Sequence, residues 1–162
     1  MAPTTTARVR RAAAALAVAG VIALGGCTST FTAQPYTPGV GVNVDQGDMK
    51  TRALVLVVDG EKALLTGAIV SNTEKDTLVK ITGQAQDATG KNLGELSFND
   101  AKVEVKPNNL VNLTEKKIST AKGKLTPGFT AELKLEFEKS GTATVVVPVV
   151  STEHADYKDI KA

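Results

Sequence analysis

Short apolar runs separated by polar turn residues fill the chain from residue 50 onward. Residues 50–58 (KTRALVLVV) and 63–70 (ALLTGAIV) flank the dipeptide Asp59-Gly60. Two β-branched runs around a short Asp-Gly turn are a strong signal for a β-hairpin, so we expect the two runs to pair.

The remaining runs also have the period of strands. Residues 130–138 alternate, with Leu133, Leu135 and Phe137 on one face and charged side chains on the other, which predicts one buried and one solvated face. Pro148 cannot donate a ladder hydrogen bond, so its strand should lie at an edge or bend there. Seven or eight short strands and no convincing amphipathic helix predict an all-β fold, an antiparallel β-sandwich or similar barrel. Beyond the hairpin, the expected strands are 77–83, 93–98, 102–106, 110–113, 130–138 and 143–150.

The first 27 residues have the layout of a secretory signal. Residues 1–11 carry three arginines and no acid, and residues 12–24 are almost wholly apolar. This run is too short to span a bilayer, which takes about 20 residues. Leu24-Gly25-Gly26-Cys27 resembles the bacterial lipobox, so we expect cleavage between Gly26 and Cys27 and a lipid on the Cys27 sulfur. Export could follow the general secretory or the twin-arginine route.

These features predict four segments. They are a signal peptide (1–26), the lipidated Cys27 with a polar, proline-containing tether (27–44), a β-sandwich (45–151) and a charged tail (152–162). Two acyl chains give stable membrane attachment, whereas one gives only marginal binding. We therefore expect a cell-membrane lipoprotein on the extracytoplasmic face, whose domain lies about 20 Å from the bilayer on a flexible-chain estimate.

The composition of the processed chain disfavours several classes of function. Three of the 19 basic and none of the 17 acidic residues fall in the signal, which leaves a net charge of −1 and gives no argument for nucleic acid. The processed chain has one His, one Cys and one Met. Histidine triads and His, Cys or Met metal sites lack their parts, so we expect no enzyme and no cofactor. Met49 and His154 are only weak candidate metal ligands.

An ordered set of short motifs resembles a known group. The chain is similar to the LpqE-like lipoproteins of actinobacterial envelopes, which look like a divergent branch of the periplasmic copper chaperones of the PCu(A)C type. The resemblance covers most of residues 34–160 and implies an immunoglobulin-like or cupredoxin-like β-sandwich. The motifs are Gln34-Pro35-Tyr36, 41–45, 47–52, 67–72, Asp76-x-Leu78, Leu125-Thr126-Pro127-Gly128, 133–137, Ser140-Gly141 and 147–149.

The copper function implied by the wider family does not carry over to these residues. Its His-x-Met motif should fall near Glu115-Lys116-Lys117, where charged groups without Cu(I) affinity stand instead. LpqE-like proteins are associated with the respiratory supercomplex of a cytochrome bc-type complex and a haem-copper oxidase. The resemblance thus implies a non-catalytic accessory or assembly subunit.

Three functional readings follow from the sequence. The first is the accessory subunit, with partner contacts through the tether (Phe31, Tyr36), the loop 114–124 and the tail. The second is a copper-handling protein with an incomplete site, and the third is a module that binds small molecules or cell wall. The residues expected to contact a partner are Tyr36, Lys116, Lys117, His154 and Tyr157.

Overall fold

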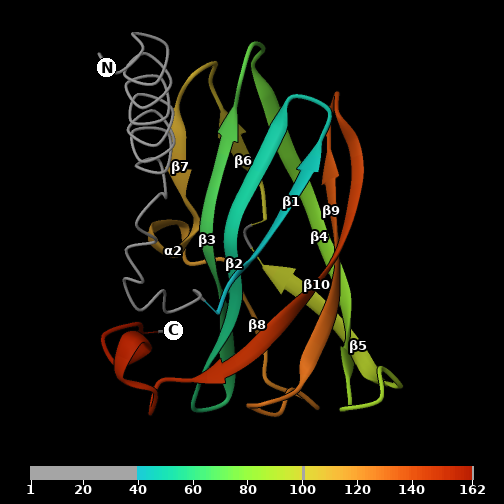
Figure 1. Cartoon of the computed structure of the whole chain (residues 1–162), viewed down its shortest axis with the longest axis vertical. Helices are drawn as coiled ribbons and strands as arrows, with labels where there is room; N and C mark the ends of the chain where they lie inside the picture. The colour runs from blue at the N-terminus through green and yellow to red at the C-terminus, as the bar shows by residue number, and fades with distance from the viewer. Residues whose placement is uncertain (1–39, 100, 162) are drawn as a thin grey trace, which may run out of the picture. The chain divides into compact units, whose positions relative to one another are not determined.

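The computed structural model describes residues 40–99 and 101–161, which form ten β-strands and two short helical turns (Figure 1). The elements are β1 (Val42–Gln46), β2 (Met49–Asp59), β3 (Lys62–Ser71), β4 (Asp76–Gln86), β5 (Asn92–Asn99), β6 (Val103–Val105), β7 (Leu110–Asn112), α2 (Leu113–Lys116), β8 (Ser119–Ala121), β9 (Thr130–Phe137), β10 (Gly141–Ser151) and the 3-10 turn η1 (Ala155–Tyr157).

The strands form two layers whose edges are joined. One layer holds β1, β2, β3, β7 and β8, and the other holds β4, β5, β6, β9 and most of β10. Hydrogen bonding runs from β2 through β10, β9, β4, β5, β8 and β3 back to β2, a closed ring of seven strands. All pairings between named strands are antiparallel except that of β10 with β2. The predicted all-β antiparallel sandwich is confirmed.

The structure confirms the expected hairpin and adds strands that the sequence pattern did not show. β2 and β3 pair as predicted around Gly60, whose φ is 58°. β1 and the three-residue β8 were not expected, because their sequences VNVDQ and STA have few apolar positions. β1 begins at Val42, so residues 42–44, assigned above to the tether, belong to the sheet. Residue 113, expected in a strand, instead begins α2.

The core is built from aliphatic side chains between the two layers. Leu133, Leu135 and Phe137 of β9 are buried as predicted, and the alternating residues Glu132, Lys134 and Glu136 face outward. β2 shows no alternation after residue 53, because all five residues from Leu54 to Val58 are buried. Successive side chains of a strand point to opposite faces, so this half of β2 is covered on both sides.

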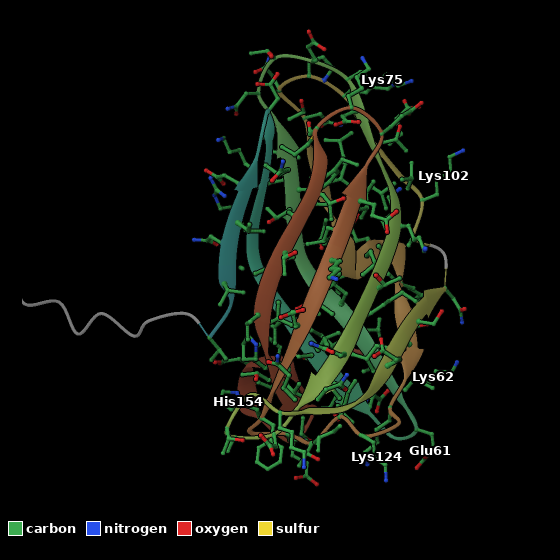
Figure 2. The ribbon with its side chains drawn as sticks, turned by 90° about the vertical axis from the view of Figure 1, so that its right-hand side faces the viewer. Glu61, Lys62, Lys75, Lys102, Lys124 and His154 are labelled. Atoms are coloured by element: carbon green, nitrogen blue, oxygen red, sulfur yellow. The ribbon has the colours of Figure 1, made fainter. Side chains whose placement is uncertain are left out.

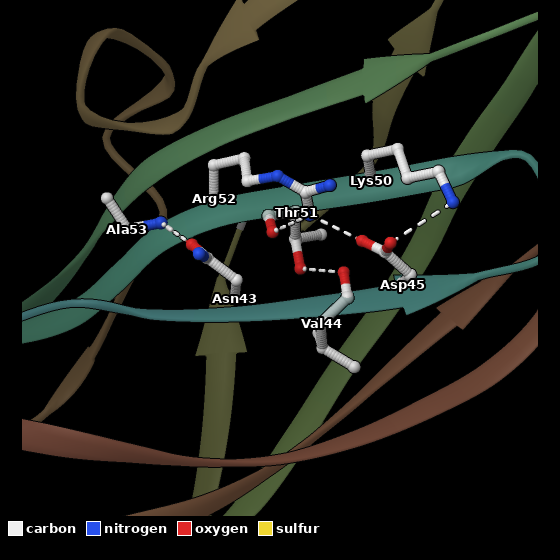
Figure 3. Close-up of polar contacts among 7 residues, drawn as sticks. All are labelled: Asn43, Val44, Asp45, Lys50, Thr51, Arg52 and Ala53. Carbon is white, nitrogen blue, oxygen red and sulfur yellow. Dashed lines mark hydrogen bonds and ion pairs between the residues drawn. The ribbon is translucent and has the colours of Figure 1, made fainter. Parts of the chain in front are cut away.

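A β-bulge at Ala53 interrupts β2, and Figure 3 shows the contact between Ala53 and Asn43 at this point. Ala53 has a φ of 54°, and its N–H donates to the Asn43 side-chain oxygen of β1 at 2.9 Å. Gly41 and Gly67 flank the bulge, and a Cβ on either would lie under 3 Å from the backbone of Arg52 or Ala53. The bulge therefore requires glycine on both neighbouring segments.

Proline 148 marks the point where β10 changes partners. Residues 141–148 pair with β9, and residues 149–151 pair in parallel with β2. Because proline has no N–H, it is suited to the end of a ladder. The expected bend at Pro148 is thus a transfer of the strand from one layer to the other.

The Asp76 carboxylate joins two loops at the other end of the sandwich. It accepts the backbone N–H groups of Thr77, Lys139 and Ser140 at 2.7, 3.0 and 2.9 Å, and the residue is 3% exposed. Burial raises the pKa of Asp76, but a hydrogen bond from the Ser140 side chain and the three backbone hydrogen bonds outweigh burial, so its pKa lies below the usual 3.8.

The bulge predicts a large difference between two glycine-to-alanine substitutions. Gly67→Ala places a Cβ 2.7 Å from the Arg52 carbonyl oxygen, whereas Gly60→Ala, also at positive φ, meets nothing within 4 Å. We expect Gly60→Ala to lower the free energy of unfolding by about 1 kcal/mol and Gly67→Ala by about 3 kcal/mol. Urea unfolding followed by circular dichroism measures both. Equal losses would mean that the bulge has room for a side chain.

The Asp76 contacts predict a pH-dependent loss in Asp76→Asn. Asparagine keeps one acceptor oxygen, so one buried N–H loses its partner, at a cost of about 2 kcal/mol at pH 7. A depressed folded-state pKa gives stability that is present above 3.8 and lost as pH falls through the folded pKa. The gap between wild type and variant should therefore narrow in acid. Asp45→Asn, at an exposed carboxylate, is the control and should cause a much smaller loss at pH 7. A gap that stays constant below pH 4 contradicts this assignment.

Candidate functional site

A shallow apolar groove of about 550 Å³ opens where β10 leaves β9 and joins β2. We call it the closure groove. Three chain segments and the first described residue contribute to it. Its lining residues are Val40, Pro127, Gly128, Phe129, Thr130, Pro148, Val149, Val150, Ser151, Glu153 and His154.

Backbone hydrogen bonds fix the walls of the closure groove. The Gly128 N–H donates to the Val149 carbonyl at 2.9 Å, and the Val149 N–H donates to the Phe129 carbonyl at 3.0 Å. The turn at Pro127-Gly128 is thereby held against β10. Phe129 and Val150 are half-buried, and Val40 is 40% exposed. The groove is thus a preformed surface with accessible apolar side chains.

The tail forms one rim of the closure groove. The Thr152 N–H donates to the Val58 carbonyl at 3.2 Å, which holds the start of the tail beside the end of β2. His154 caps η1, since its Nδ1 accepts the Asp156 N–H at 3.3 Å. The rings of His154 and Tyr157 lie 5.7 Å apart. Burial, and next the Asp156 charge, raise the pKa of Tyr157. The predicted contact residues His154 and Tyr157 therefore lie at, or next to, the groove.

The closure groove also lies where the N-terminal part of the chain enters the sandwich. Val40 is the first described residue and lines the groove, two residues before β1. The segment expected to carry the lipid anchor therefore joins the domain at this end. The closure groove and the point where this segment enters the domain are therefore at the same end.

The structure separates the two weak metal-ligand candidates. Met49 is fully buried at the start of β2, paired with Ser71, whereas His154 follows β10 beyond the other end of β2. The intervening strand spans roughly 30 Å at about 3.3 Å per residue. In Figure 2, His154 lies at the opposite end of the molecule from Lys75, which belongs to the loop after Ser71. Met49 and His154 therefore cannot hold one ion within this domain.

The other predicted residues fall elsewhere. Lys116 and Lys117 are exposed at the end of α2, which packs against β3, so they belong to another surface element than the tail. Cleavage at Gly26, lipidation at Cys27 and the contacts of Phe31 and Tyr36 fall outside the described residues.

Asp45, Lys50 and Arg52 form a local charged cluster on β1 and β2. Hydrogen bonds from Arg52 and Lys50 lower the pKa of the exposed Asp45 (Figure 3).

Within residues 40–99 and 101–161, no three His, Cys, Asp or Glu side chains are placed to hold a metal ion. No helix in these ranges has the length and apolar content needed to cross a bilayer.

Sequence reasoning missed most of the closure groove. Phe129 lies beside Val149 because the antiparallel pairing of β9 with β10 continues past Thr130 and Pro148, and Val40 joins this surface from the start of the described chain. Pro127-Gly128 and Pro148 did stand out in the sequence, as a turn and as a strand irregularity. These two irregularities were the available signal, because both mark the ends of regular pairing.

The fold resembles solved copper-protein domains. The copper-bound PCuAC domain from PmoF2 aligns with a TM-score of 0.51 at 18% identity, covering 68% of this chain and 98% of that domain. The apo form of the PmoF2 domain gives 0.52 at 17% identity, covering 70% and 98%. The apo PCuAC domain from PmoF1 gives 0.50 at 22% identity, covering 68% and 99%.

These likenesses show a shared fold and nothing finer at such identities. The PCuAC-type fold expected from the resemblance is confirmed, and the narrower LpqE-like assignment stays a prediction. Neither a protein-family model nor a curated protein sequence matches the chain.

Proposed function

We propose that the chain is a non-catalytic lipoprotein of the extracytoplasmic membrane face that serves a respiratory cytochrome bc–oxidase supercomplex as an accessory or assembly subunit. The observation that carries the proposal is the coincidence of the tether's entry, at Val40, with the closure groove. A non-catalytic protein that works by binding a membrane partner needs its binding surface near the membrane, and therefore near its anchor.

The tether length supports a partner in or at the membrane. The thirteen residues 28–40 lead from Cys27 to Val40 inclusive, which corresponds to a root-mean-square span of about 20 Å and a maximum of about 45 Å. A groove at that height reaches the extramembrane parts of membrane proteins. The respiratory identity of the partner rests on the resemblance of the ordered sequence motifs to the LpqE-like group.

The proposal predicts co-purification with haem proteins. Tagged full-length protein, purified from membranes in mild detergent, should bring cytochrome subunits in near-stoichiometric amount, checked by mass spectrometry and a haem spectrum. Because the bait and its partner must share the membrane plane, Cys27→Ser should reduce the yield of haem by about tenfold or more. Cys27→Ser should also move the protein to the soluble fraction. A wild-type eluate without cytochromes would refute the respiratory assignment.

Copper handling is the second candidate, favoured by the likeness to a domain whose solved form is copper-bound. The chain's own residues give it little support, since Met49 is buried and far from His154. We therefore expect a chromogenic Cu(I) chelator to retain its metal when the protein is added in excess. Removal of copper at micromolar or tighter affinity, abolished by Met49→Ala or His154→Ala, would establish the copper function instead.

A further inference from the structure

We infer that the closure groove is the docking site for an apolar peptide segment, flanked by basic side chains, in the extramembrane part of a membrane-embedded protein. The inference rests on the proposed function for the anchor. It adds the surface that docks and the chemistry of the segment received there.

The apolar character of the segment follows from the groove walls. Val40, Phe129 and Val150 offer hydrocarbon at its surface, and Pro127 and Pro148 add rigid apolar rings. Neither proline has a backbone N–H, so hydrogen-bond donors are few along these walls. An apolar segment gains about 25 cal/mol for each Å² of apolar surface that it removes from water here. A strongly polar segment has little to bind.

The basic flank follows from the charge at the rim. Glu153 is exposed and is the one acidic residue of the groove lining, which contains no lysine or arginine. An acidic side chain beside an apolar patch favours a partner with lysine or arginine next to its apolar residues.

The membrane-embedded source of the segment follows from the chain itself. Val40 is part of the groove wall, so the groove cannot move farther from the anchor than the tether allows. With Cys27 lipidated, a soluble partner would gain nothing from this placement. A partner held in the same bilayer encounters the groove at high effective concentration.

Photo-crosslinking in intact membranes tests the inference. A benzoylphenylalanine replaces Phe129 in the full-length lipoprotein, and the matched control carries it at Val146, which is 47% exposed on β10 outside the groove. We expect position 129 to crosslink to one membrane-embedded protein, through an apolar peptide that has lysine or arginine next to it. Position 146 should give at least about fivefold less of that product.

Charge substitutions give a second readout with the same controls. Val40→Asp should reduce the crosslink from position 129 by about tenfold, whereas Val146→Asp, at a slightly more exposed valine, should leave it within about twofold. Glu153→Lys should reduce it by about fivefold. Unchanged circular dichroism and thermal midpoints confirm that each variant folds.

Other crosslinking outcomes overturn the inference. One such outcome is that position 129 crosslinks to lipid, to residues 28–39 of the same chain, to a second copy or to a soluble protein. Another is that positions 129 and 146 give equal amounts of product, and a third is that position 129 gives no product. The respiratory proposal is tested separately. A membrane-embedded partner without haem would preserve the groove inference and refute the respiratory assignment. If the Val40→Asp variant co-purifies as much haem as the wild type, the respiratory proposal stands and the groove inference is refuted.

Discussion

Along its outer edge β2 pairs first with β1 and then with β10, and the change of partner falls at the bulge of Ala53. The same edge of β2 therefore pairs with β1, which lies at the edge of the sheet, and with β10, which closes the ring. Bulges increase local twist and redirect a strand. The left-handed φ of Ala53 is stabilised by Asn43 and is possible only beside Gly41 and Gly67. Ring closure thus depends on a few backbone contacts without large side chains.

The closure groove is a consequence of that geometry. Because β10 occupies the edge of β2 from residue 56 onward, β1 cannot extend along that edge and begins at Val42, opposite Leu54. The segment 127–130 then packs beside β10 without a further strand to cover it. Apolar side chains that would be core in a fully covered sandwich remain accessible. The groove and the entry of the tether therefore share one cause.

The sequence was sufficient to predict the fold class and most strands. A strand with one buried face shows alternating apolar residues, and a strand buried on both faces shows a continuous apolar run. The sequence failed at β1 and β8, where pairing is fixed by neighbours rather than by apolar content. The charged tail drew attention to His154 and Tyr157, whose contact with a partner stays a prediction, but nothing in the sequence drew attention to Phe129 or Val150. Those two lie in ordinary-looking runs, and their shared surface forms where the β9–β10 pairing ends and β10 joins β2.

A shallow groove of this size supports only modest affinity by itself, since association costs translational and rotational freedom before any contact stabilises the complex. The proposed lipid anchor would change that balance. It would confine groove and partner to one membrane surface, so that the second contact is effectively intramolecular and needs few strong interactions. An aliphatic sandwich with an apolar groove beside the proposed anchor meets that requirement. The same groove on a freely diffusing protein would be an exposed patch with little specificity.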